Sequence, residues 1–329
     1  MQSAGKRIQY EASANFGVSS TTRTSSVAEP RISGFTMAVI ANILWGTSFL
    51  ASKHTLTAWG PLTSSALRFA VALLALSLVL PLAGCRIRLK GFSWQALKGI
   101  SMVGITGFGV LYPLQLKGLT SISSGLSAAI MLTSPLFVLA FNAMLFRGNL
   151  SLNKVVALLL GLGGGLILLF GQDQSAGNDN VLFGAALTFL ASMSLALSVL
   201  ATRAVSQHVD AGNLTFWSMF VGLLLLLPFA AQESMTTEFV NPSTAAIASL
   251  IYLGVVCSAV CFWLWNSAIA KSSPAELATT MHLKTPTAVL LGALIASESI
   301  SFVMIVGILV VAAGVFFSQW TASVKGMSR

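Results

Sequence analysis

The sequence predicts an all-α integral membrane protein with ten transmembrane helices, arranged as two inverted five-helix repeats. Three observations support this prediction: a very apolar composition, ten apolar runs of spanning length, and residues that recur at a fixed offset. Of the 329 residues, 55% are hydrophobic and 8% are charged, whereas soluble domains carry about 25% charged residues. This composition excludes soluble enzymes, nucleic-acid-binding proteins and disulfide scaffolds.

The apolar runs define the expected spans. A membrane helix needs about 20 mostly apolar residues to cross about 30 Å of hydrocarbon. Ten runs meet this requirement, and the loops between them are too short for a soluble domain: 35–52, 62–82, 98–116, 124–146, 154–171, 181–201, 213–231, 246–268, 275–297 and 302–320. Residues 1–34 are rich in Ser, Thr and Ala and lack a signal-peptide core, so we expect a disordered tail there and a second tail at 321–329.

The positions of Lys and Arg predict the orientation. With the N-terminus inside, most of the 18 basic residues lie in cytoplasmic segments. The outer loops 172–180 and 232–245 carry acidic residues and no Lys or Arg. We therefore expect a multi-pass protein of the cell inner (plasma) membrane with both termini cytoplasmic. The net charge of +9 then reflects topology, with membrane lipids as partners and no nucleic acid.

An internal repeat has an offset of about 150 residues. The matching residues are Lys53 with Arg203, Pro135 with Pro286, Ser151 with Ser301, and Gly164 with Gly314. Each unit, 35–171 and 181–320, holds five spans, and an odd number of crossings inverts the second copy relative to the first. Inverted repeats are the build of many secondary transporters, which hold substrate near the midplane. We expect transport by alternating access, with helix breaks at Pro135 and Pro286.

Several stretches resemble the EamA-type branch of the drug/metabolite transporter superfamily. They are Asn42-Ile-Leu-Trp-Gly-Thr-Ser-Phe49 running to Lys53, Arg68, the runs Gly118–Pro135 and Ala268–Pro286, and Glu298-Ser-Ile-Ser301 through Gly307 and Gly314. The resemblance implies a ten-helix carrier of small metabolites, similar to bacterial exporters of amino acids and related compounds. Two stretches depart from the family pattern: Arg147-Gly148-Asn149 replaces the usual glutamate, and Leu195-Ala196 replaces Trp-Gly in the second half.

Charge within the spans is cationic. None of the nine acidic residues lies in the interior of a span, since Glu276 and Glu298 lie at the two ends of the span 275–297. This disfavours export of lipophilic cations by a buried carboxylate. Arg68 and Lys284 do lie within spans, where insertion costs about 2.5–3.5 kcal/mol at the helix centre. We expect Lys284 to bind a substrate carboxylate; the alternative is a structural lysine bonded to carbonyls that Pro286 frees. Arg68 lies near enough to its span's end to snorkel, so a structural role is favoured over substrate binding.

Aromatic and amide side chains provide further candidates for substrate binding. Stripes that mix the two suit a cavity that holds an apolar side chain and fixes its polar end. The candidates are Asn42 and Trp45 on the first span, Tyr112 and Gln115 on the third, and Trp263 and Asn266 on the eighth. Ordinary helix packing is the alternative interpretation of these stripes.

His282 lies about 200° around its helix from Lys284 at 100° per residue, and is therefore interpreted as a packed or interfacial residue. The alternative is a proton relay in a proton-coupled multidrug antiporter. No phosphate-binding loop, metal-ligand spacing or catalytic cluster is present, so we expect no ATP, metal, cofactor or enzymatic activity. The favoured function is a secondary carrier or facilitator for small carboxylate-bearing metabolites, with amino-acid export as the leading class.

Overall fold

The computed structural model describes residues 32–88, 91–145, 155–156, 159–160, 163–164, 167, 180–238, 240–272, 277, 280–281, 283–298 and 300–327. Most of the expected span 154–171, nearly all of the N-terminal tail, and His282 lie outside these residues. The described regular elements are all helical. Seven of them are long and apolar enough to cross a membrane, and two shorter apolar helices cover Lys284–Ala296 and Phe302–Gly314.

The described helices lie mostly within the predicted runs, although α14 continues to Met327, into the segment expected as a tail. In the first half they are α1 (Gly34–Leu56), α2 (Pro61–Leu82), α3 (Trp94–Gly104), the π-helical segment η1 (Ile105–Val110), α4 (Leu111–Leu119), α5 (Ser124–Met131) and α6 (Ser134–Leu145). In the second half they are α8 (Val181–Val205), α9 (Ala211–Thr236), α10 (Thr244–Tyr252), the π-helical segment η3 (Leu253–Val260), α11 (Cys261–Lys271), α13 (Lys284–Ala296) and α14 (Phe302–Met327).

Side-chain caps start several of these helices. At each such start a Ser or Asp oxygen accepts a backbone N–H from the first turn, which would otherwise lack a partner in an apolar environment. The capping residues are Ser33 for α1, Ser93 for α3, Ser123 for α5, Asp210 for α9 and Ser243 for α10.

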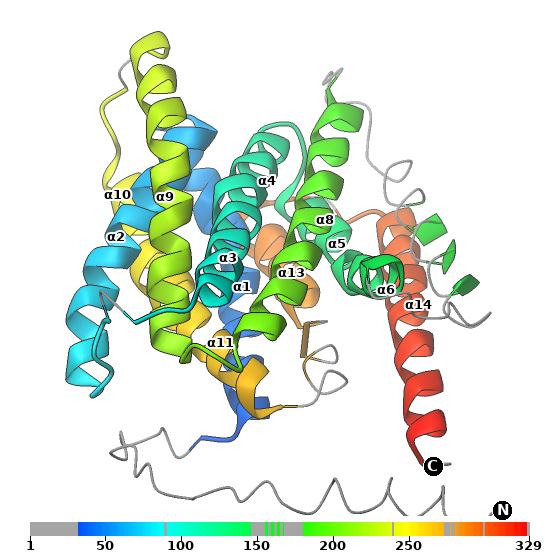
Figure 1. Cartoon of the computed structure of the whole chain (residues 1–329). Coiled ribbons are helices and arrows are strands. Elements are labelled where there is room, and N and C mark those ends of the chain that lie inside the picture. The colour runs from blue at the N-terminus through cyan, green and yellow to red at the C-terminus, as the bar shows by residue number, and fades with distance from the viewer. Residues whose placement is uncertain are drawn as a thin grey trace, which may run out of the picture. The chain divides into compact units, whose positions relative to one another are not determined.

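The two halves interleave. Helix α1 packs against α10, α11 and α13 of the second half, and α8 packs against α3, α4, α5 and α6 of the first half (Figure 1). Because α1 and α8 are the first helices of their halves, each opening helix is embedded in the opposite half. Helix α2 likewise packs against α9. Helices from both halves therefore pack around α1 and around α8.

Both halves carry the same two interruptions. A π-helical segment lies between two α-helical parts of the third span in each half, η1 and η3. A second break comes just before a proline: α5 ends at Met131 and α6 starts at Ser134, while α13 starts at Lys284. Pro135 and Pro286 thus lie in the first turn of a new helix, where the missing N–H costs nothing.

Glu298 joins three segments beyond the end of α13. Its carboxylate accepts hydrogen bonds from Lys53 Nζ at 2.8 Å, from Ser124 N at 2.9 Å and Oγ at 2.7 Å, and from Gly125 N at 3.2 Å. It therefore ties the end of α1 to the start of α5. Burial alone would raise the pKa of the Glu298 carboxyl, but the hydrogen bonds from Lys53 and Ser124 outweigh it and hold the pKa below its ordinary value.

A different cluster fixes the loop between α2 and α3. Asn213 near the start of α9 accepts from Arg88 N at 2.8 Å and donates to Arg86 O at 3.1 Å. The Cys85 thiol donates to Asp210 Oδ1 at 3.3 Å. Burial, followed by the Asp210 charge, raises the pKa of Cys85 to about 11, so this cysteine remains a thiol at neutral pH. The loop is thus held at the end of the bundle where α2 ends and α9 begins.

Candidate functional site

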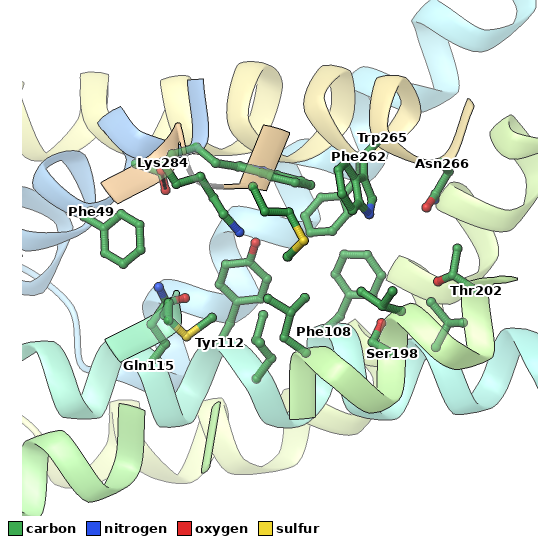
Figure 2. Close-up of a pocket in the computed structure, with 18 residues that line it drawn as sticks. Phe49, Phe108, Tyr112, Gln115, Ser198, Thr202, Phe262, Trp265, Asn266 and Lys284 are labelled. Atoms are coloured by element: carbon green, nitrogen blue, oxygen red, sulfur yellow. Dashed lines mark hydrogen bonds between the residues drawn. The ribbon is translucent and has the colours of Figure 1, made fainter. Parts of the chain in front are cut away.

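A cavity of about 700 Å³, counted out to its open mouth, lies between the two halves (Figure 2). Eighteen residues line it: Trp45, Ser48, Phe49, Val103, Phe108, Leu111, Tyr112, Gln115, Met131, Leu195, Ser198, Val199, Thr202, Phe262, Trp265, Asn266, Met281 and Lys284. They come from α1, the third span and α5 of the first half, and from α8, α11 and the segment around α13 of the second half.

Lys284 supplies the charge of the cavity. It is the first residue of α13, it is buried, and its Nζ lies 5.5 Å from the centroid of the Trp45 ring. Figure 2 shows its ammonium pointing toward the Tyr112 hydroxyl. Among the described residues no carboxylate pairs with Lys284; the ion pair that the structure shows joins Lys53 and Glu298. An ammonium without a carboxylate partner among the described residues can bind an anion in the cavity.

Gly46 allows α1 to approach α13 beside this lysine. A Cβ at position 46 would lie 2.5 Å from Thr287 Cβ and 2.8 Å from the Lys284 carbonyl oxygen. Both distances are far below van der Waals contact, so a larger residue would push the two helices apart. Trp45 thus forms one wall of the cavity, and Gly46 next to it allows the close helix approach that places Lys284 against the Trp45 ring.

Aromatic rings form the middle of the cavity. Trp45 Nε1 donates to the Cys257 carbonyl oxygen at 2.8 Å, which fixes the plane of the indole. Ring centroids lie 5.0 Å apart for Trp45 and Phe262, 5.6 Å for Trp45 and Trp265, and 4.7 Å for Phe108 and Phe262. Aromatic packing at these distances is favourable and rigid. The middle of the cavity is therefore shaped for an apolar body.

Polar groups mark the two ends. Gln115 lies with Phe49 near the Lys284 end, while Ser198, Thr202 and Asn266 lie at the other end (Figure 2). Asn266 Nδ2 donates to Thr215 Oγ1 at 2.8 Å, which fixes the side-chain amide. A molecule with one charged end and an apolar body fits this arrangement.

Arg68 lies behind the cavity wall. Its side chain is buried, Nε donates to Ser258 Oγ at 2.6 Å, and Cζ lies 4.4 Å from the centroid of the Tyr112 ring. The expected snorkelling to the membrane surface does not occur, because Ser258 and the Tyr112 ring provide partners inside the bundle. Arg68 is not among the cavity-lining residues.

The structure brings five of the predicted binding residues together around the cavity: Trp45, Tyr112, Gln115, Asn266 and Lys284. The remaining predicted residues lie elsewhere. Asn42 is fully buried and donates to Ala38 O at 2.8 Å and Thr280 Oγ1 at 3.1 Å, and Trp263 is half-buried outside the lining. His282 lies outside the described residues.

Sequence reasoning missed Phe262 and Trp265, which line the cavity where Trp263 was expected. On the regular helix α11, Phe262, Trp265 and Asn266 recur at i, i+3 and i+4 and share the face that lines the cavity. Trp263 is rotated by about 100° from Phe262 and therefore lies off this face. The spacing of Ser198 and Thr202, four apart on α8, was a usable signal for the polar end.

Known proteins match nearly the whole chain. YoaV of Bacillus subtilis, an uncharacterized transporter, is 23% identical over 293 residues, which cover 87% of this chain and 96% of the relative. Protein PecM of Dickeya dadantii is 24% identical, with 86% of this chain and 91% of PecM covered. A probable terminal-alkyne amino-acid exporter of Streptantibioticus cattleyicolor is 23% identical, with 76% and 81% covered.

A solved crystal structure shares the fold. It has a TM-score of 0.65 at 17% sequence identity, and the match covers 89% of this chain and 98% of the other. The EamA-like transporter family matches twice, at residues 32–170 and 182–320. Two matches agree with the two-repeat, multi-pass membrane architecture that the helices form. The chain belongs to the EamA-like transporter family.

Proposed function

We propose that this membrane transporter is a secondary carrier or facilitator for small carboxylate-bearing metabolites. The observation that carries the proposal is the Lys284 ammonium, which faces a cavity built by both halves and has no described carboxylate partner. Buried charges are paired or serve a function, because an unpaired charge in a membrane interior is costly. A substrate carboxylate at Lys284, with its apolar body among Trp45 and Phe262, provides the missing partner.

The transport cycle that we propose is alternating access in ten spans, arranged as two inverted halves with both termini on the cytoplasmic side of the inner membrane. The interleaved packing of α1 and α8 and the paired interruptions in the two halves support it. If two similar halves exchange conformations, the cavity changes the side on which it opens. No ATP is required for such an exchange.

Amino acids are the first substrate class to test, with export as the proposed direction. A related protein is named as a probable terminal-alkyne amino-acid exporter, and an amino acid carries both the carboxylate and the variable side chain that the cavity accommodates. The test is uptake of a labelled amino-acid panel into proteoliposomes of the purified protein without a pH gradient. Flux above that of empty vesicles supports a facilitator.

Two other outcomes are informative. Flux that appears only with an imposed proton gradient would favour the proton-coupled alternative and make His282 the next residue to change. No flux of any carboxylate under either condition contradicts the proposal.

Lys284→Ala is the sharper test. We expect at least a tenfold loss of flux, because one charge-assisted hydrogen bond contributes about 1.5–3 kcal/mol. Lys284→Arg keeps the charge and should retain part of the activity. The matched control is Lys117→Ala, which removes an exposed lysine outside the cavity and should leave flux unchanged. Normal transport by folded Lys284→Ala protein would rule out the anchor.

A further inference from the structure

We propose that the cavity selects a net anion over a zwitterion: between a carboxylic acid and the amino acid with the same side chain, it prefers the acid without the ammonium group. The inference rests on the proposed function and narrows it. It follows from the charges of the residues that line the cavity and of Arg68 behind its wall.

The first observation is the charge of the lining. Among the eighteen residues that line the cavity, Lys284 is basic and none is acidic. An α-ammonium group is attached to the carbon next to the carboxylate, so a carboxylate bound at Lys284 brings the substrate ammonium close to the lysine ammonium. No carboxylate of the lining offsets this repulsion. A 2-oxo acid or a simple carboxylic acid avoids it.

The second observation is Arg68. Its side chain is 2% exposed, Nη2 has no hydrogen-bond partner, and no described carboxylate pairs with it. Its guanidinium stacks against the ring of Tyr112, and the Tyr112 hydroxyl points into the cavity toward Lys284 (Figure 2). Charge interactions are weakly screened inside a protein, so this second cation adds to the positive potential at the same end of the cavity.

The third observation concerns the groups that would have to accept an ammonium. The Trp45 ring already interacts with the Lys284 ammonium, which lies 5.5 Å from its centroid. Lys284 is also the first residue of α13, and the amino end of a helix carries partial positive charge. Lys284, Arg68 and the amino end of α13 therefore favour negative charge at this end of the cavity, and aromatic faces, hydroxyls and amides are left to balance a substrate ammonium.

The test uses ligands with the same apolar body. Phenylpyruvate, L-phenylalanine and phenethylamine share a phenyl ring and carry net charges of −1, 0 and +1 at neutral pH; 4-methyl-2-oxopentanoate and L-leucine form a second pair. Binding and flux are measured with the purified full-length chain in proteoliposomes. We expect each oxo acid to bind at least about tenfold more tightly than its amino acid, and phenethylamine not to compete.

The outcomes separate this inference from the proposed function. If the amino acids bind as tightly as the oxo acids, or more tightly, the charge selection is wrong while the carboxylate carrier stands. If no carboxylate binds or moves, both are wrong. If phenethylamine competes with either acid, the cavity accepts cations and the inference is likewise overturned.

Arg68→Gln tests the positioning residue behind the wall. We expect the preference for the oxo acid to fall to less than about threefold, because the second cation is lost while Lys284 still binds the carboxylate. Arg68→Lys keeps the charge and should keep the preference. Arg86→Gln, at an exposed arginine outside the cavity, is the control. A merely structural role would lower both affinities equally, so an unchanged ratio in Arg68→Gln, or a lost ratio in Arg68→Lys, overturns the role of Arg68.

Discussion

At the scale of single residues, Trp45 connects the features that make the cavity a site. Its ring faces the Lys284 ammonium, its edges pack against Phe262 and Trp265, and its indole N–H is fixed by the Cys257 carbonyl. A ring held on three sides cannot rotate away when a substrate enters. The position of the ammonium and the width of the aromatic section are therefore set together.

Replacing Trp45 tests this. Trp45→Ala leaves a cavity among packed rings, and such substitutions lower the free energy of unfolding by about 3–5 kcal/mol. Trp45→Phe retains most of the packing and loses the hydrogen bond to Cys257, so we expect a smaller effect. The measurements are thermal unfolding in detergent and substrate affinity. Trp94→Ala, at a 70% exposed tryptophan, is the control, and an equal loss there would show that Trp45 has no special role.

At the scale of helices, the sequence predicts where a span lies better than which face of the span lines the cavity. Trp45 was expected to face the pocket and does so, on the uninterrupted helix α1. On the eighth span the expectation was right for Asn266 and wrong for Trp263, because the face of α11 that lines the cavity includes Phe262, and Trp263 is rotated by about 100° from it. Apolar runs therefore predicted where the spans lie, but not the rotation within this one.

Helix ends also hold the halves together. Glu298 lies beyond α13 of the second half and binds Lys53 of α1 and the backbone of Ser124 at the start of α5. The sequence showed Glu298 as part of a family motif but gave no indication of its partners, which are more than 170 residues away along the chain. We infer that Lys53, Ser124 and Glu298 act as a latch at one end of the cavity, since Phe49 lines the cavity and lies one turn before Lys53.

The latch predicts a specific pH dependence. The pKa of Glu298 is lowered in the folded protein, so its contribution to stability is present above the ordinary carboxyl pKa of about 4.3 and is lost as the pH falls through the lower folded value. Glu298→Gln should lower the free energy of unfolding at pH 7 by on the order of 2 kcal/mol and therefore lower the midpoint of thermal unfolding.

The difference between Glu298→Gln and the unchanged chain should shrink as the pH falls below 4. Glu238→Gln, at an exposed glutamate, serves as the control and should change neither the midpoint nor its pH dependence. A difference that stays constant down to the lowest pH would contradict the latch.

At the scale of the whole molecule, the cavity has unequal ends. The Phe49 end lies next to the Lys53–Glu298 pair, whereas the other end is lined by Thr202 and Asn266, close to where α8 and α11 end. The partners that bridge the halves at the Phe49 end are charged, and the residues lining the opposite end are neutral. In an alternating-access carrier this asymmetry favours the state that opens on the Thr202 side.

Thiol labelling tests this asymmetry. In a background with Cys85, Cys257 and Cys261 replaced by Ala, Thr202→Cys should react rapidly with a membrane-impermeant reagent added on the side that bears the N-terminus, because both termini are proposed to lie there with the end of α8. Phe49→Cys should react slowly from either side while the latch is closed.

Adding Glu298→Gln should raise the labelling rate of Phe49→Cys from the opposite side several-fold. It should lower the labelling rate of Thr202→Cys, because a molecule that opens on one side is closed on the other. Adding Glu238→Gln should change neither rate. If both positions label faster with Glu298→Gln, the latch stabilises the fold without selecting a state. A coupled, opposite change would show that one ion pair at the end of the bundle biases which side of the membrane the cavity faces.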